Sequence, residues 1–343
     1  MSCDLTPELA AAGLATLPDA NPRRTRDRLA RHPDPRDALF AACGAIGVDP
    51  TPRLRRLVSR GTRAWWAGGP DAPIVDEVAD RPAVLLGEGD RPEALRAGRV
   101  AVVGTRSASP HGLADAREIG EMLAHAGVTV VSGLAIGIDA AAHVGALDTG
   151  GAAIGVVATG LDVVYPRRHG SLFARVRERG LLVGEQPFGV PPDRFRFPVR
   201  NRIIAALADA VVVVEATLKG GARITAEHAL DYGRPVLAVP GSRRNPAAAG
   251  TNSLIADGAH PLLDPADILV SLGLSGGAVT ARSQPAPVGH DARGVLAACS
   301  GEAATADQLA ARTGLGLEAV AGALVELERG GHIQHDRGYW WPT

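Results

Sequence analysis

The feature that most constrains the fold is a series of short runs rich in valine, isoleucine and leucine, each followed by a stretch of helical composition. The runs are VAVVG (100–104), VTVVSG (128–133), AIGVVATG (153–160), LLVGE (181–185), AVVVVEA (210–216) and PVLAVPG (235–241). Apolar strands without alternation are typical of a parallel sheet that helices cover on both faces. We therefore predict a doubly wound, Rossmann-like α/β domain over residues 98–274, with its ligand at the carboxyl ends of the strands.

Two segments precede this domain. Residues 1–80 begin with four short helix-like runs, each opened by Thr, Asn or Asp and a Pro, and they predict an N-terminal helical module. The Arg-rich stretch LPDANPRRTRDRL is open to a second interpretation, a helix–hairpin–helix on DNA backbone, but it lacks the small residues of such a turn. A packing module is therefore favoured. Residues 81–97 predict a connector with one strand-like stretch at Ala83–Leu86.

Two further segments follow the domain. Residues 275–290 have the composition of a linker, and residues 291–343 predict three helices and a β-hairpin, which together make a winged helix–turn–helix. Thr305 and Gln308 fit a capping box at the start of the second helix. This segment carries four basic and seven acidic side chains, and its expected recognition helix holds Glu318, Glu326 and Glu328. Such a surface repels phosphates, so we expect it to bind protein or to pack on its neighbour.

The overall charge excludes a strongly basic nucleic-acid binder. The chain has 36 basic and 37 acidic side chains, so any anion site must come from local clustering. Three widely spaced cysteines (Cys3, Cys43 and Cys299) predict neither a zinc site nor a disulfide framework. The sequence shows no long apolar run and no secretory signal pattern, so we expect a cytoplasmic protein without membrane contact, metal or cofactor.

The turn after the first strand is a candidate anion site. Gly104, Thr105 and Arg106 end the strand, and Ser109-Pro110 predicts that a helix starts immediately afterwards. Backbone N–H groups at a helix N-terminus attract anions, and Arg106 adds a fixed charge. A tight turn with a solvated arginine explains this motif equally well.

The turn after the second strand is glycine-rich. Gly133 and Gly137 flank it and allow a ligand to approach closely, although glycines here more often serve strand–helix packing. Asp139 and His143 follow at helical spacing. Acid–base catalysis is one interpretation of that pair, but such pairs more commonly cap a helix.

Residues 191–210 alternate cations with aromatics before a helix predicted to start near Ile203. No acidic residue separates the arginines, and Asn201 can donate to or accept from a base edge. Cations interleaved with aromatics hold phosphates and stack bases. The alternative is that the phenylalanines anchor a loop while the arginines lie in solvent. The residues concerned are Arg194, Phe195, Arg196, Phe197, Arg200, Asn201 and Arg202.

Two more glycine-rich loops carry cations. Lys219 is the only lysine in the chain and precedes Gly220-Gly221 at a predicted helix start. A compact ammonium group can enter an anion pocket that a planar guanidinium cannot. The alternative is that one lysine remains by chance among 36 basic positions. The last loop holds Arg243, Arg244 and, at the next helix, Asn252. Four such loops at one sheet edge predict a groove for a polyanion.

Common catalytic motifs are missing. The sequence has no G-x-x-x-x-G-K-[ST], G-x-G-x-x-G, G-x-S-x-G or HExxH, and it offers no nucleophile with an adjacent base. We therefore expect a binding protein rather than an enzyme.

The motifs resemble the DprA/Smf family, the DNA-processing proteins of bacterial natural transformation. The resemblance covers most of the chain and rests on VAVVGTR, VVSGLAIGIDAAAH, TGLDVVYP, the F-P-x-R-N-R-I-I run at 197–204, the run at 219–226, RPVLAVPG and GTNSLIADGA. It implies a protein that binds single-stranded DNA, forms a homodimer through the Rossmann-like domain and loads RecA recombinase during recombination. It further implies that Arg106 and Lys219 contact phosphates and that Arg200 and Asn201 line the pocket.

The chain departs from the family at one motif. Where the family usually has K-S-G-S-L, this sequence has Lys219-Gly220-Gly221-Ala222-Arg223, which removes two hydroxyl donors and adds a cation. One alternative is an enzyme of the lysine-decarboxylase-like family that hydrolyses nucleoside monophosphates, but the expected glutamate after Gly250-Thr251 is missing. A purely structural adaptor acting through its winged helix is a third interpretation, and it would not need four cationic loops.

Overall fold

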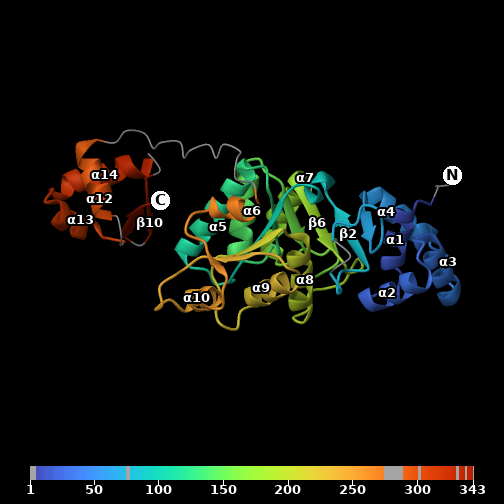
Figure 1. Cartoon of the computed structure of the whole chain (residues 1–343). Helices are drawn as coiled ribbons and strands as arrows, with labels where there is room; N and C mark the ends of the chain where they lie inside the picture. Colours follow the sequence, from blue (N-terminus) through green and yellow to red (C-terminus); the bar gives the residue numbers. More distant parts are fainter. Residues whose placement is uncertain are drawn as a thin grey trace. The chain divides into compact units, whose positions relative to one another are not determined.

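The computed structural model describes residues 5–74, 78–273, 289–299, 303–329, 332–336 and 338–342 of the 343-residue chain. The chain divides into two compact units, residues 1–277 and 278–343 (Figure 1). The predicted linker, 275–290, lies outside the described residues apart from Gly289 and His290. Within the described ranges, no helix combines the length and apolar character that crossing a bilayer requires.

The first unit is built on a nine-stranded sheet with the order β1-β2-β6-β5-β4-β3-β7-β8-β9. The strands from β3 onward pair in parallel, whereas β2 is antiparallel to both β1 and β6. This confirms the predicted, mostly parallel Rossmann-like sheet. The strands are β1 (Arg63–Trp66), β2 (Val84–Glu88), β3 (Arg99–Val103), β4 (Thr129–Ser132), β5 (Ala153–Val156), β6 (Gly180–Gly184), β7 (Ala210–Val213), β8 (Val236–Ala238) and β9 (His260–Pro261).

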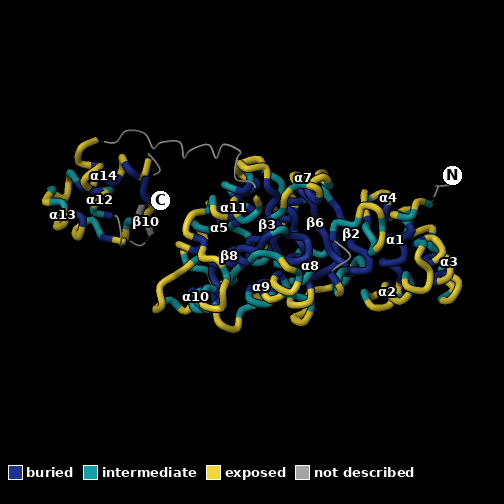
Figure 2. The backbone as a smooth tube through the Cα atoms, viewed as in Figure 1, coloured by how far each residue is buried: buried dark blue, intermediate teal, exposed yellow. Residues whose placement is uncertain are grey.

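Helices cover both faces of the sheet because alternate strand residues point in opposite directions. One face, with Ala101, Val103 and their neighbours, packs on α8 (Arg196–Leu207), α9 (Gly221–Asp231) and α10 (Ala249–Ala256). The opposite face, with Val100 and Val102, packs on α5 (Pro110–His125), α6 (Ile138–Asp148) and α11 (Asp267–Ser271). Figure 2 shows the central strands as buried and the outer sides of the helices as exposed. The remaining helix of this layer is α7 (Gly170–Arg179).

Four helices precede the sheet, as the sequence predicts. The first three are N-capped by Thr6, Asn21 and Asp34, each followed by a proline in the first turn. The helices are α1 (Pro7–Ala15), α2 (Pro22–Arg31), α3 (Pro35–Ile46) and α4 (Thr51–Arg60).

The predicted boundary between this module and the sheet differs from the structure. The strand-like stretch predicted at Ala83–Leu86 is β2, which is buried along its length and pairs with β6, so residues 81–97 contribute a strand to the sheet. Strand β1, which falls inside the predicted helical module, pairs with β2 at the end of the same sheet. Residues 61–97 therefore extend the parallel sheet by two strands.

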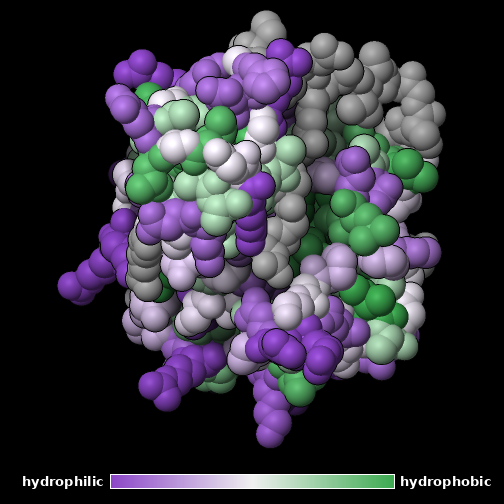
Figure 3. All heavy atoms as spheres, turned by 90° about the vertical axis from the view of Figure 1, so that its left-hand side faces the viewer, coloured by the Kyte–Doolittle hydropathy of each residue, from purple (hydrophilic) through white to green (hydrophobic). Residues whose placement is uncertain are grey.

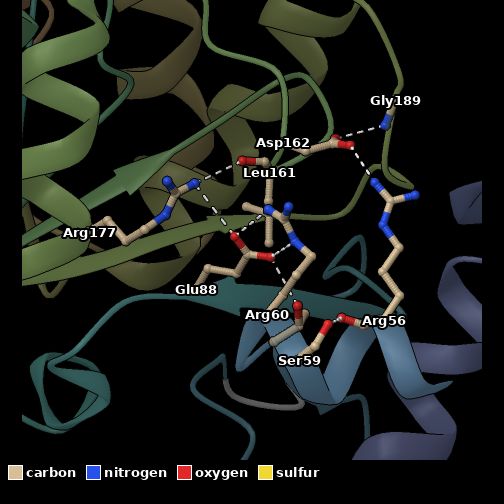
Figure 4. Close-up of polar contacts among 9 residues, drawn as sticks. Arg56, Ser59, Arg60, Glu88, Leu161, Asp162, Arg177 and Gly189 are labelled. Atoms are coloured by element: carbon tan, nitrogen blue, oxygen red, sulfur yellow. Dashed lines mark hydrogen bonds and ion pairs between the residues drawn. The ribbon is translucent and has the colours of Figure 1, made fainter. Parts of the chain in front are cut away.

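A buried carboxylate ties α4 to the sheet (Figure 4). Glu88 on β2 is 3% exposed, and both of its oxygens accept from the Arg60 guanidinium at 2.7 Å. The Thr62 hydroxyl donates to the same carboxylate at 2.9 Å, and Arg177 on α7 lies 3.5 Å away. A fork-shaped pair of this kind fixes orientation as well as charge. The helical module is thus attached to the sheet at a defined place.

The second unit is a winged helix, as predicted. It contains α12 (His290–Cys299), α13 (Ala306–Thr313), α14 (Leu317–Arg329), β10 (Ile333–Asp336) and β11 (Tyr339–Pro342). Its own core includes Val295, Leu309, Leu324 and Ile333, and the capping box of Thr305 and Gln308 is confirmed. On the face of the molecule drawn in Figure 3, hydrophilic and hydrophobic side chains are interspersed.

Candidate nucleic-acid interface

The candidate site lies where the strand order of the sheet reverses. Strand β3 has β4 on one side and β7 on the other. The strands that follow β3 in the sequence are therefore added first on one side of it (β4, β5, β6) and then on the other (β7, β8, β9). Ligands of doubly wound sheets bind in the crevice at such a point. The predicted loops meet here through their backbones: Thr105 N donates to Glu215 O at 2.7 Å, and a Cβ on Gly137 would lie 2.4 Å from Thr105 O.

The helix N-terminus predicted as an anion site after β3 is already filled by a carboxylate. Ser109 caps α5 as predicted, but its N–H and its hydroxyl also donate to Glu215 at 2.8 and 2.6 Å. A Cβ on Gly112 would lie 2.5 Å from the Glu215 carboxyl carbon, so this carboxylate sits directly against the first turn. The sequence analysis missed Glu215, although its place at the end of a neighbouring strand was a usable signal. The positive end of the α5 helix dipole is therefore neutralised by the Glu215 carboxylate.

Arg106 is exposed beside this helix start and stacks on an aromatic ring. Its guanidinium carbon lies 4.9 Å from the centre of the Phe197 ring. Helix α8 begins at Arg196 rather than near Ile203, so Phe197 belongs to its first turn. The expected loop of alternating cations and aromatics is therefore helical from Arg196 onward. Its helical geometry separates the arginines onto different sides.

Arg200 is buried and holds the loop after β4. Its guanidinium is 5% exposed and donates to Gly133 O at 2.9 Å and to Val156 O. Asp139 accepts from Gly133 N at 3.1 Å and from Ala135 N at 3.3 Å. The N–H of Gly133 is thus bound by the buried Asp139 side chain, and its C=O by the buried Arg200 side chain. A Cβ at Gly133 would lie 2.4 Å from the guanidinium, which leaves no room for a side chain there.

Arg200 and Asp139 each counteract the effect of burial on the pKa of the other. Burial lowers the pKa of Arg200 to about 10, and Asp139 opposes that shift. Burial raises the pKa of Asp139, while Arg200 and the two backbone donors act against it. Since the side chain of Arg200 is enclosed and its donors serve carbonyls, its position suits support of the loop rather than contact with a phosphate.

Two other predicted arginines of α8 also have protein partners. Arg202 forms a 2.6 Å ion pair with Glu185, and both side chains are nearly buried, so this charge is compensated. Arg196 donates to Pro191 O at 2.8 Å and lies over the ring of Phe195, 5.0 Å from its centre. Arg202 thus resembles Arg200 in being enclosed, whereas Arg196 and Phe195 remain near solvent.

The start of α9 lies at the same edge of the sheet and differs from the start of α5 in its cap. Its N-cap is Gly220, and no side chain caps it. Asn201 on α8 donates to Gly221 O at 3.0 Å, and Lys219 is exposed two residues before the helix. No carboxylate forms an ion pair with Lys219 among the described residues. An exposed lysine without an ion-pair partner among the described residues thus comes directly before a helix start that no side chain caps.

The loop after β8 is held by Asn252. Its amide accepts from Gly241 N at 3.1 Å and donates to Gly241 O at 2.9 Å, so both of its functional ends are used within the chain. Arg243 and Arg244 are exposed in this loop. Gly250 N donates to Ala216 O at 2.7 Å, which joins the start of α10 to the loop after β7.

His143 and Thr251, which belong to motifs considered for catalysis, are both buried. His143 is fully buried in α6, and burial lowers its pKa to about 4, so it is neutral and out of reach of solvent. Thr251 is also buried and donates to Ala248 O at 3.0 Å, which gives no support to a phosphoribohydrolase site. In the described part of the chain, no group of three His, Cys, Asp or Glu residues is placed to hold a metal ion.

The fold defines a Rossmann-like α/β protein with a C-terminal winged helix. A family model for DNA recombination-mediator protein A matches residues 70–273, and a model for the DprA winged helix domain matches residues 279–338. The chain therefore belongs to the DNA recombination-mediator protein A family, also called DprA/Smf.

Known proteins of the family resemble the chain over different lengths. Protein Smf of Escherichia coli (strain K12) is 44% identical over 201 residues, which cover 58% of this chain and 54% of that protein. A putative DNA processing protein DprA of Mycobacterium tuberculosis (strain H37Rv) is 40% identical over 282 residues, which cover 80% of this chain and 67% of that protein. The chain thus matches about half the length of the first relative.

Two solved structures have the same fold. The X-ray structure of DprA from Streptococcus pneumoniae has a TM-score of 0.61 at 30% identity and covers 78% of this chain and 93% of that one. DprA from Helicobacter pylori has a TM-score of 0.52 at 29% identity and covers 57% of this chain and 89% of that one. That structure was described for its mode of binding single-stranded DNA.

We predict that the winged helix does not bind duplex DNA. Its acidic helix α14 occupies the position of a recognition helix, and like charges repel at short range. Fragment 289–343, which has its own core, should leave a duplex unretarded in a gel at physiological salt. A shifted band at low micromolar protein would contradict this prediction.

Proposed function

We propose that this protein binds single-stranded DNA at the carboxyl edge of its sheet and acts there as a binding protein rather than an enzyme. The observation that carries the proposal is the start of α9, which no side chain caps, which exposed Lys219 precedes by two residues, and whose Gly221 carbonyl accepts from Asn201. The stacked pair of Arg106 and Phe197 adds a cation and an aromatic surface at the same edge. The Helicobacter pylori relative, whose structure was described for its mode of binding single-stranded DNA, supports the same conclusion.

Two kinds of group at this edge bind different parts of the DNA. Lys219, Arg106 and the N-terminus of α9 attract phosphates, which carry most of the affinity and none of the sequence information. Asn201 and the aromatic rings face the bases, and stacking tolerates every base. The loop after β4 is held in its conformation by the hydrogen bonds that Gly133 makes with Asp139 and Arg200.

We further propose that the protein forms a homodimer through the Rossmann-like domain and hands its DNA to RecA recombinase in natural transformation or recombination. Family membership supports this role. The DNA would be internalised, so we place the protein in the cytoplasm.

We expect the affinity for a single-stranded oligonucleotide to fall steeply with salt. The logarithm of the affinity should decrease with the logarithm of the salt concentration by about 0.7 per phosphate neutralised. Fluorescence anisotropy with matched single-stranded and duplex oligonucleotides over a salt series measures this slope. A flat profile, or equal binding of both forms, would refute the proposed interface. Release of free base from nucleoside monophosphates would instead support the enzymatic alternative.

A further inference from the structure

We propose that the segment Tyr165–Arg168, which follows β5, is a second nucleic-acid-binding element. The ring of Tyr165 would stack on a base, and Arg167 and Arg168 would hold the flanking phosphates. This inference rests on the proposed binding of single-stranded DNA and extends that interface along the same sheet edge.

Tyr165 presents an aromatic surface that the fold supports from behind. Its side chain is 40% exposed, and its ring centre lies 5.4 Å from that of Phe197 with a 40° tilt. Phe197 is also the ring on which Arg106 stacks. Tyr165 is therefore continuous with the residues proposed to bind DNA.

The aromatic content of this edge is high for this chain. Aromatic residues make up 3% of the sequence, yet Tyr165 contacts Phe197 in the first turn of α8, and Phe195, the N-cap of that helix, is 61% exposed. Leaving large apolar rings in water is unfavourable unless a partner covers them. Nucleobases are flat, apolar on their faces and suited to such rings.

The segment is held rigidly at both ends. The Thr159 hydroxyl donates to Val163 O at 2.9 Å before Tyr165, and His169 N donates to Pro166 O at 2.9 Å after it. The His169 ring nitrogen Nδ1 lies 3.0 Å from Leu134 O, in the loop that also contains Gly133. A ring fixed in this way loses little freedom when a base binds.

The two arginines supply charge without internal compensation. Arg167 and Arg168 are exposed in a single 3₁₀ turn (Arg167–His169), and neither makes an ion pair within the described ranges. The acidic residue of the same loop, Asp162, instead accepts from Gly189 N at 2.7 Å and lies 3.5 Å from Arg56 (Figure 4). The loop therefore presents two positive charges beside an exposed ring, a combination that suits a single strand.

The test compares Tyr165→Leu and Tyr165→Phe in the full chain, by anisotropy with a single-stranded oligonucleotide and with the same oligonucleotide carrying abasic sites. Tyr165→Leu should weaken binding of the normal oligonucleotide by roughly 5- to 100-fold without changing the salt slope, because a base contact and not a phosphate contact is lost. Tyr165→Phe should stay within about 2-fold of the parent, since the ring remains. On the abasic oligonucleotide the two variants should bind alike. Phe40→Leu, an exposed aromatic on α3, is the matched control.

The charges are tested by Arg167→Gln with Arg168→Gln. This double variant should make the salt slope shallower by about 1.4, or about 0.7 for each phosphate released. Arg23→Gln with Arg31→Gln on α2 removes the same charge elsewhere and should leave the slope unchanged. Unchanged affinity of Tyr165→Leu, or an equal loss on the abasic oligonucleotide, overturns the stacking role while the parent still binds. If the parent chain itself fails to bind single strands, both this inference and the proposed function are wrong.

Discussion

Arg200→Ala is expected to lower the free energy of unfolding by about 3–5 kcal/mol, the usual cost of removing one of two buried charges that offset each other. The variant would leave Asp139 enclosed without its nearby cation, and it would release the carbonyl groups of Gly133 and Val156. Urea unfolding at constant pH measures the loss. Arg196→Ala, which removes a partly exposed arginine from the same helix, should cost less than about 1 kcal/mol.

The loss caused by Arg200→Ala should also depend on pH. Asp139 already has a raised pKa in the folded protein, and removing Arg200 raises it further. A carboxyl group whose pKa is higher in the folded than in the unfolded state favours folding at low pH, and this benefit disappears as the pH rises through the folded pKa. The deficit should therefore be smaller in acid than at neutral pH. Equal stability of the Arg200→Ala and Arg196→Ala proteins would contradict the assigned role of the buried pair.

Lys219→Ala is expected to weaken binding of single-stranded DNA by roughly 10- to 100-fold at low salt and to make the salt slope shallower by about 0.7. The reason is that this ammonium is exposed and unpaired beside the uncapped start of α9. Lys219→Arg should also weaken binding, but with an unchanged slope, because the charge remains while the planar group no longer fits. Anisotropy over a salt series measures both quantities.

The control for Lys219 is Arg23→Ala, which removes a single exposed charge from α2, away from the sheet edge. It should bind like the parent. If Lys219→Arg binds as tightly as the parent, the argument from the single lysine fails. If Lys219→Ala does so as well, the start of α9 is not the phosphate site.

Much of the fold was predictable because its signals are local. Runs of β-branched residues mark the parallel strands, and Ser109 and Thr305 cap the helices that the sequence assigned to them. Strand β1 was missed because its short, Trp-containing run has no neighbour in sequence that reveals its pairing with β2. The start of α8 was placed too late because its first turn consists of residues that also suit a loop.

The candidate site was less predictable because exposure depends on distant contacts. Arg106 and Arg200 look equivalent in sequence, yet one is exposed and the other is enclosed, where it bonds carbonyl groups of β5 and of the loop after β4. Arg202 is compensated by Glu185, 17 residues away, and Glu215 reaches Ser109 across 106 residues. Counting cations in a motif therefore overestimates how many of them a ligand can reach.

The carboxylate of Glu88 has a consequence for how the protein can be shortened. The matched family region starts at residue 70, so a fragment trimmed to it would lack Arg60, Thr62 and the whole of β1. Its truncated sheet would then end in the apolar strand β2, with the edge that faces β1 unpaired and the Glu88 carboxylate poorly neutralised, and open edges of that kind recruit other chains. Soluble expression of the α/β domain thus depends on keeping the helices in front of it.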